Sequence, residues 1–262
     1  MSEPVLYLQD GVVATITLNR PSVLNAGNRD LLAGLRQALA RAGEDDEVGA
    51  VVITGSGRAF SAGADLAAGP WWPDGMSTGE GIGWILENWW NPTAKTIATF
   101  PKPTVAAVNG VAAGGAVGLA LACDLVVAAE SACFIEVFGP QLALVPDVGS
   151  SWHLPRLVGP ARARGLAMLG DRLQARRAAE WGLIWECVPD AELARRAAAL
   201  ATRLAGYDRE AMLAIRAVLD ESPFLSLDEA LAKEAEVNTR LGDGPGLAEG
   251  ITAFLEKRRP VF

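Results

Sequence analysis

The spacing of apolar residues changes along the chain, and each spacing predicts a different kind of element. The stretch 7–18, YLQDGVVATITL, has alternating positions behind an Asp10-Gly11 pair. Alternation is typical of a half-buried strand and Asp-Gly of a tight turn, so a β-hairpin is expected. From Asn28 onward apolar residues recur every three or four positions, which predicts a helix. Its buried face is expected to carry Leu31, Leu35, Ala38, Leu39 and Ala42.

Continuous apolar runs predict the interior of a sheet. Three such runs are VGAVVITG (48–55), TVAAVNG (104–110) and DLVVAA (124–129), and CFIEV (133–137) is a shorter fourth. Uninterrupted branched residues suit strands that are buried on both faces. Because helical stretches separate these runs, roughly the first 150 residues are expected to alternate strand and helix in an α/β fold.

Beyond Gly159 the strand pattern nearly disappears. Helical spacing continues to the end of the chain, and only LIWECV (183–188) could be extended. We therefore expect an α/β core over residues 1–200 that carries the functional site, and a helical region over residues 201–262. The stretch 67–81, AAGPWWPDGMSTGEG, is rich in proline and glycine and is expected to form a mobile surface loop.

Composition narrows the class of protein. Half of the 262 residues are hydrophobic, so a large core can be buried, and the formal net charge is −8. A negative surface repels nucleic-acid phosphates, and no basic stripe with interleaved aromatics is present, so no nucleic-acid partner is expected. The chain shows neither a signal-peptide pattern nor an apolar run near the ~20 residues of a membrane span. These features indicate a cytoplasmic protein with no membrane partner.

Few residues are candidates for metal or nucleophile chemistry. Cys123, Cys133 and Cys187 are widely spaced and lack a C-x-x-C pair, which indicates reduced thiols rather than a disulfide framework or a zinc site. No group of Asp, Glu and His has the spacing of metal ligands. His153 is the only histidine, and no nucleophile elbow is present, so catalysis by histidine is not expected.

Two glycine-rich stretches partly match nucleotide-binding loops but lack the deciding residues. After Gly55-x-Gly57, a dinucleotide fingerprint would need a third glycine where Phe60 stands. The stretch GVAAGG (110–115) would need a following lysine where Ala116 stands, so it is not a phosphate-binding loop.

The glycines still need a reason. Gly115 begins a helix after a strand, where its N–H could point at an oxyanion or where the missing side chain could allow close helix–sheet packing. The loop SAGADL (61–66) consists mostly of small residues and also exposes backbone amides. Two amides from separate loops are what an oxyanion hole requires. The residues alone leave both interpretations of Gly115 open.

The stretch LALVPDVGSSW (142–152) contains one carboxylate, Asp147. Aspartate is a common helix N-cap, and DVGSS could open a helix. Apolar neighbours such as Leu144, Val145 and Trp152 would instead raise the pKa of the carboxyl group, which suits a residue that takes a proton and then returns it. Both roles remain open at this point.

Three long motifs together resemble one known family. They are VVITGSGRAFSAGADL (51–66), PKPTVAAVNGVAAGGAVGLALACDLVVAAESACF (101–134) and LVPDVGSSWHLPRLVG (144–159), and they are similar to those of the enoyl-CoA hydratase/isomerase (crotonase) family. The resemblance extends from about Val12 to the C-terminus. It implies a spiral of ββα units closed by helices, trimers or dimers of trimers assembled through the C-terminal region, and an acyl-CoA thioester substrate. Coenzyme A is then part of the substrate, and no separate cofactor is implied.

The resemblance also assigns the catalytic positions. The family's oxyanion-hole amides correspond to Ala64 and Gly115. The two glutamates of the hydratases correspond to Gly118 and Gly139, so both are missing. Asp147 is then the one carboxylate in the matched motifs left to move a proton.

Within the family the chain looks most like the ring-epoxide isomerases of phenylacetate catabolism, and an acyl-CoA isomerase with Asp147 as acid and base is expected. A 2-enoyl-CoA hydratase of fatty-acid or aromatic degradation, with Glu136 as an unusual carboxylate, is the first alternative. The second is a non-catalytic acyl-CoA-binding paralogue.

The expected substrate contacts come from four parts of the chain. The segment after Arg20 would pass the nucleotide, the loop 61–66 would lie beside the thioester, and the tail would reach the CoA of a neighbouring subunit. The tryptophans at 84, 89 and 90 could line an aromatic acyl pocket or pack in the core. The expected positions are Val23, Ala26, Ala62, Asp65, Leu66, Trp89, Phe254 and Lys257.

Overall fold

The computed structural model describes residues 3–262. Its larger sheet has six strands in the order β1-β2-β3-β5-β7-β10. The predicted hairpin pairs β1 and β2 antiparallel, and the other neighbours pair parallel, as expected for buried apolar runs. The strands are β1 (Val5–Asp10), β2 (Val13–Leu18), β3 (Ala50–Gly55), β5 (Thr104–Val108), β7 (Leu125–Ala129) and β10 (Glu186–Val188).

A second, smaller sheet has the order β4-β6-β8-β9. Its strands are β4 (Ala59–Ser61), β6 (Val111–Ala113), β8 (Cys133–Ile135) and β9 (Leu173–Gln174). Each of β3, β5 and β7 in the large sheet is followed at once by a short strand of the small sheet, and helical segments lead to the next pair. This repeat of two strands and a helix is the ββα unit that was expected.

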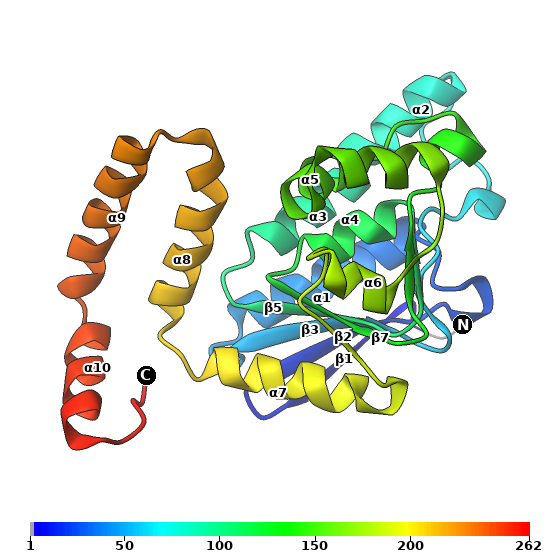
Figure 1. Cartoon of the computed structure of the whole chain (residues 1–262). Helices are drawn as coiled ribbons and strands as arrows, with labels where there is room; N and C mark the ends of the chain where they lie inside the picture. Colours follow the sequence, from blue (N-terminus) through cyan, green and yellow to red (C-terminus); the bar gives the residue numbers. More distant parts are fainter. Residues whose placement is uncertain (1–2) are drawn as a thin grey trace.

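Helices cover both faces of the large sheet. Figure 1 shows α3, α4 and α5 above it and α7 below it. The first helix begins behind the Asn28 side chain, which accepts a hydrogen bond from the N–H of Leu31. The helices of this body are α1 (Arg29–Glu44), α2 (Thr78–Ile85), α3 (Asn91–Ala98), α4 (Gly115–Leu121), α5 (Ser150–Leu169), α6 (Ala175–Glu180) and α7 (Leu193–Ala205).

Short 3₁₀ and π-helical turns connect these elements. Two π-helical turns, η3 and η4, lie beside the site described below. The turns are η1 (Pro21–Val23), η2 (Leu66–Ala68), η3 (Leu86–Trp90), η4 (Phe138–Leu142), η5 (Asp190–Glu192) and η6 (Ser222–Phe224).

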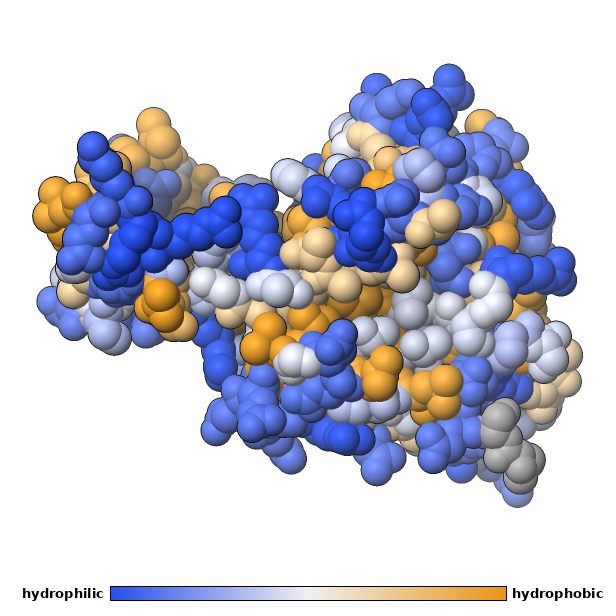
Figure 2. Space-filling model, turned by 90° about the horizontal axis from the view of Figure 1, so that it is seen from below, coloured by the Kyte–Doolittle hydropathy of each residue, from blue (hydrophilic) through white to orange (hydrophobic). Residues whose placement is uncertain are grey.

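The last three helices form a lobe that stands apart from the body. They are α8 (Arg209–Glu221), α9 (Leu227–Gly242) and α10 (Pro245–Glu256), at the left of Figure 1. Figure 2 shows the lobe from below, joined to the body across a narrow waist. The predicted boundary at residue 200 falls inside α7, which packs on β3 and β5, so the lobe itself begins at α8.

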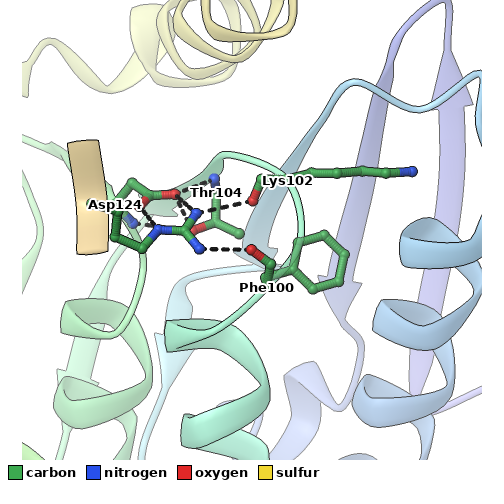
Figure 3. Close-up of polar contacts among 5 residues, drawn as sticks. Phe100, Lys102, Thr104 and Asp124 are labelled. Atoms are coloured by element: carbon green, nitrogen blue, oxygen red, sulfur yellow. Dashed lines mark hydrogen bonds and ion pairs between the residues drawn. The ribbon is translucent and has the colours of Figure 1, made fainter. Parts of the chain in front are cut away.

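One arginine fastens the lobe to the body. The guanidinium of Arg216 on α8 pairs with Asp124, with Nε 2.6 Å from Oδ1 and one terminal nitrogen 2.7 Å from Oδ2. It also donates to the carbonyl oxygens of Phe100 and Lys102. Thr104 donates to the same carboxylate from its backbone N–H (Figure 3). A two-pronged ion pair with carbonyl acceptors fixes the direction of α8 as well as its position.

The loop predicted over residues 67–81 is shorter than expected. Ser77 accepts a hydrogen bond from the N–H of Glu80, and the Glu80 carboxylate accepts one from the N–H of Ser77. This reciprocal capping starts α2 at Thr78. Within residues 3–262, no helix has both the length and the apolar composition needed to cross a membrane.

Candidate active site

A small cavity of about 80 Å³ lies among the segments that follow β4, β6 and β8, next to the segment that precedes α5. It brings together the three residues expected to be catalytic: Ala64 after β4, Gly115 at the start of α4, and Asp147 before α5. Larger hollows of 490 to 840 Å³ open elsewhere, but Asp147 lines none of them. The other lining residues are Ala62, Gly63, Leu66, Trp90, Gly114, Val137, Phe138 and Leu142.

Gly115 has the geometry that each of the two interpretations requires, an unpartnered N–H and a close packing contact. As the first residue of α4, its N–H has no partner within the helix. A Cβ atom at this position would lie 2.8 Å from Cγ2 of Val148 and 3.4 Å from Oδ1 of Asp147. The missing side chain therefore allows the segment before α5 to come close, and the same contact brings the amide of Gly115 next to the carboxylate.

The amide of Ala64 is left free by a tight local fold. Gly27 donates to the carbonyl of Gly63 at 2.6 Å, and Asp65 donates to the carbonyl of Gly27 at 2.9 Å, while the N–H of Ala64 donates to no described residue. Gly63 has a φ of 84°, and a Cβ there would approach the carbonyl of Ala113 to 2.6 Å. Glycine at 63 is thus required for the turn that frees this amide.

Asp147 does not cap the following helix. The N-cap of α5 is Gly149, and no side chain caps it. The side-chain atom Oδ1 of Asp147 is buried and has no hydrogen-bond partner among the described residues. Burial raises the pKa of this carboxyl to about 7, although its own backbone N–H favours the charged form. The carboxylate is therefore poised to exchange a proton near neutral pH.

The residue after Asp147 explains why a hydratase glutamate has no room here. Val148 is buried and has a φ of 52°, a left-handed conformation that β-branched residues rarely adopt and that costs about 1–3 kcal/mol. Its carbonyl oxygen would collide with any Cβ at Gly118. At Gly139 a Cβ would lie 3.1 Å from the carbonyl of Ala167. A side chain at Gly118 would therefore require the backbone of Val148 to move, whereas one at Gly139 would require the neighbouring carbonyl to shift by a few tenths of an ångström.

Comparison with known proteins decides the family. A family model described as enoyl-CoA hydratase/isomerase matches residues 9–262. The chain belongs to the enoyl-CoA hydratase/isomerase family. The two sheets and the C-terminal helices accordingly form the crotonase fold that was expected. A crystal structure of an enoyl-CoA hydratase from Polaromonas sp. JS666 superposes with a TM-score of 0.90 at 33% identity, covering 98% of each chain.

Two relatives carry different activities in their names. The chain is 40% identical over 262 residues to the 1,2-epoxyphenylacetyl-CoA isomerase of Escherichia coli, covering 100% of this chain and 99% of that protein. It is 42% identical over 250 residues to a probable enoyl-CoA hydratase of Rhodobacter capsulatus, covering 95% and 94%. The sequence of this family member is thus about equally similar to a relative named as an isomerase and to one named as a hydratase.

Glu136 lies close to the site of this hydratase/isomerase but does not line its cavity. It follows β8 directly and is 3% exposed. Its pKa is raised to about 7, mainly by burial; the hydroxyl of Ser150 lowers the pKa and the charge of Asp147 raises it. The cavity is lined instead by the next residue, Val137.

Of the predicted substrate contacts, Ala62 and Leu66 line the cavity and Asp65 lies outside it. Asp65 pairs with Arg20 at 2.8 Å, and its Oδ1 accepts from the N–H of Ala68. Arg20 also donates to the carbonyl of Ala26. Val23 lies on the same segment, in η1, and is 39% exposed. The Arg20–Asp65 pair therefore holds this segment against the loop that carries Ala64.

The structure places Trp90 at the cavity and Trp89 outside it. Trp89 packs edge-on against Trp71 at 6.1 Å between ring centroids and lies beneath the guanidinium of Arg29. Trp90 is the last residue of η3 and is 3% exposed. The cluster of tryptophans indicated the region, but the neighbouring residue is the one that meets the cavity.

Phe254 and Lys257 are not brought to the cavity within one chain. Both belong to α10 or its C-cap, in the separate lobe (Figure 1). Phe254 is 81% exposed. Within residues 3–262, no group of three or more His, Cys, Asp or Glu side chains is placed to hold a metal ion.

Sequence reasoning missed the aromatic and apolar wall formed by Val137, Phe138 and Leu142. These residues belong to the π-helical turn η4 or immediately precede it. A turn of five residues leaves no periodic pattern, so only the apolar composition of the segment could have indicated it.

Proposed function

We propose that this member of the family is an acyl-CoA isomerase that moves a double bond or opens a ring epoxide through a thioester enolate. One observation carries the proposal: among the described residues, Asp147 is the only carboxylate that lines the cavity shared with Ala64 and Gly115. A single carboxylate can take a proton from one carbon and return it to another. Hydration would call for a second group to hold and activate water.

The two amides supply the electrostatic part of the mechanism. When the substrate loses its α-proton, negative charge moves onto the thioester oxygen. The N–H groups of Ala64 and Gly115 are free to donate to that oxygen, and one such donor typically lowers the barrier by ~2.7–4 kcal/mol. Stabilising the enolate in this way makes the α-proton acidic enough for a carboxylate to remove.

Asp147 supplies the proton-transfer part. With its pKa raised to about 7 by burial, the carboxylate is a stronger base than an exposed aspartate and its acid form still gives the proton back. In the first step the C–H electron pair enters the enolate and the proton goes to Asp147. In the second step a remote carbon of the enolate takes that proton. For a ring epoxide, the enolate electron pair instead forms a new C=C bond as the epoxide C–O bond breaks, and the released oxygen takes the proton. Asp147 returns to its carboxylate form in both cases.

The shape of the cavity supports an unsaturated or aromatic acyl group. Trp90, Phe138 and Leu142 form much of the wall, and flat rings or double bonds pack well against such side chains. The Escherichia coli relative named as a 1,2-epoxyphenylacetyl-CoA isomerase supports the ring-epoxide version of the proposal.

The CoA portion is proposed to bind across two subunits. The segment with Val23 and Ala26 would contact the nucleotide in its own chain, and Phe254 and Lys257 would reach it from a neighbour. The lobe exposes several large apolar side chains, which favours association into a trimer or a dimer of trimers. They are Leu227, Leu231, Leu247, Ile251, Phe254 and Leu255.

A 2-enoyl-CoA hydratase is the second candidate, favoured by the buried carboxyl of Glu136 near Asp147. A relative in Escherichia coli named as a 2,3-dehydroadipyl-CoA hydratase is 34% identical over the full chain. Crotonyl-CoA tests this candidate, because hydration removes its enoyl absorbance. An acyl-CoA-binding paralogue without turnover is the third candidate and would be indifferent to changes at Asp147.

The deciding experiment compares Asp147→Asn with wild type on a panel of 3-enoyl, 2-enoyl and phenylacetyl-derived CoA thioesters. We expect the variant to lose isomerisation by at least ~10²-fold while still binding the thioester, because a positioned acid–base contributes that much. Asp171→Asn, at an exposed carboxylate outside the site, is the matched control. Unchanged isomerisation by Asp147→Asn, or loss of enoyl absorbance from crotonyl-CoA as the main reaction, would contradict the proposal.

A further inference from the structure

Buried polar atoms without partners gather around Asp147. Within residues 3–262, six buried side-chain atoms have no hydrogen-bond partner, and four of them belong to Glu136, Asp147 and Ser150. Glu136 is 3% exposed and Ser150 0%, and the Ser150 hydroxyl lies near enough to lower the pKa of Glu136 although no well-formed hydrogen bond joins the two side chains. Native proteins pair nearly all such atoms, so their concentration beside a cavity points to a role in the reaction.

Glu136, Asp147 and Ser150 lie at different depths from the cavity. Asp147 lines the cavity, whereas Glu136 and Ser150 do not. Glu136 extends from the end of β8, and Ser150 is the first residue of α5. Glu136 therefore lies on the protein side of Asp147, and the charge of Asp147 raises the pKa of the Glu136 carboxyl.

Among the described residues, no cation compensates the two carboxyl groups. Asp147 is the charged group that acts on Glu136. Arg172, near β8, acts on Cys133 instead, and Arg176 on α6 pairs with Glu130 at 2.6 Å. His153, further along α5, is acted on by Arg156. Two neighbouring buried carboxylates without a counter-ion are costly to ionise at the same time.

We propose that Glu136 is a positioning residue of this site: once the buried pair has lost its first proton, from Asp147, the carboxyl group of Glu136 keeps the second, so that Asp147 is ionised and free to accept a proton from the substrate. This inference rests on the proposed role of Asp147. During turnover Asp147 receives the substrate proton and returns it, while Glu136 keeps its own. At higher pH Glu136 also ionises, and its charge makes protonated Asp147 a poorer acid, so the return step slows.

The test is the pH profile of kcat/KM for Glu136→Gln against wild type. Glutamine has the shape of the protonated glutamic acid and cannot ionise. We expect the wild-type rate to fall on the alkaline side, and we expect Glu136→Gln to keep its rate at neutral pH within a fewfold and to lack that fall. Glu130→Gln, an exposed carboxylate that pairs with Arg176, is the control and should keep the wild-type profile. A purely structural Glu136 would lower the rate evenly at every pH and leave the alkaline fall in place, which would overturn the proposal.

A second measurement does not need turnover. Infrared difference spectra of the free protein report the carbonyl band of protonated carboxyl groups, and subtraction of Glu136→Gln isolates Glu136. In Asp147→Asn, Glu136 should release its proton about one pH unit lower than in wild type, because its charged neighbour is gone. An unchanged titration overturns the pairing even if Asp147 is the base. A shifted titration in a variant that still isomerises instead contradicts the proposed function, and the role of Glu136 with it.

Discussion

At the residue scale, Asp147 has a buried carboxyl oxygen without a hydrogen-bond partner among the described residues. Ionising this carboxyl group lowers the stability of the folded chain. An unfolded chain releases the proton of an aspartate near its ordinary pKa of 3.8, whereas the folded chain holds it until about 7. Between these values the folded state binds more protons than the unfolded state. The free energy of unfolding therefore falls as the pH rises through this window.

Asp147→Asn should remove this fall in the free energy of unfolding with rising pH, because asparagine does not ionise. The variant is expected to match wild type near pH 4, where the aspartate is protonated, and to be more stable by roughly 1–3 kcal/mol at pH 8. Urea unfolding at both pH values, at one protein concentration, measures the difference. Asp171→Asn should show no such pH-dependent gain, and equal stabilities of wild type and Asp147→Asn at pH 8 would contradict the expectation.

At the element scale, the π-helical turn η3 ends at the tryptophan that lines the cavity. A π turn contains one more residue than an α turn, so it rotates the side chains that follow it. Trp90 at its end is buried at the cavity, and Trp89 packs on Trp71 outside it.

Replacing each tryptophan by alanine separates the two positions. Trp90→Ala should lower kcat/KM by at least ~10-fold, because a wall of the acyl pocket is lost and a buried aromatic truncation also costs about 3–5 kcal/mol of stability. Trp89→Ala should leave kcat/KM close to wild type. Steady-state kinetics on the best thioester of the panel, at a temperature where both variants are folded, checks this. A larger effect at Trp89 would return the pocket to the residue expected from sequence.

The length of an element decides whether the sequence pattern could predict it. The long strands β3, β5 and β7 and the helix α1 follow uninterrupted or periodic apolar runs, so they were predictable. The strands β4, β6 and β9 have two or three residues, too few for a period to be visible. The residues alone made Gly115, the loop 61–66 and Asp147 candidates, the resemblance chose among the interpretations, and the cavity brings Ala64, Gly115 and Asp147 together. Its wall depends on π turns and on the contact between Val148 and Gly118, which are set by packing between distant segments.

At the scale of the whole molecule, the lobe depends on the Arg216–Asp124 pair, whose side chains are only 18% and 22% exposed. The pair crosses from α8 to the body, and the carbonyls of Phe100 and Lys102 complete it. Hydrogen bonds to charged groups at such partly buried positions contribute more than exposed ion pairs.

Arg216→Ala should lower the free energy of unfolding by about 2–3 kcal/mol and loosen the lobe. Arg240→Ala is the matched control, because Arg240 pairs with Glu210 at the surface, and exposed pairs contribute about 0–1 kcal/mol. Urea unfolding gives the stabilities, and sedimentation shows whether assembly changes with them. Equal losses for both variants would mean that the pair does not hold the lobe.

The contact between Gly118 and Val148 also restricts the routes by which this sequence could diverge. A side chain can be added at 118 only after the carbonyl of Val148 has moved, and Val148 already stands in a conformation that glycine would adopt without strain. A mutational path toward a glutamate at 118 therefore has to remodel residues 147–149 first. Those residues include Asp147, so a change that makes room at position 118 also moves the carboxylate to which the proposed proton transfer is assigned.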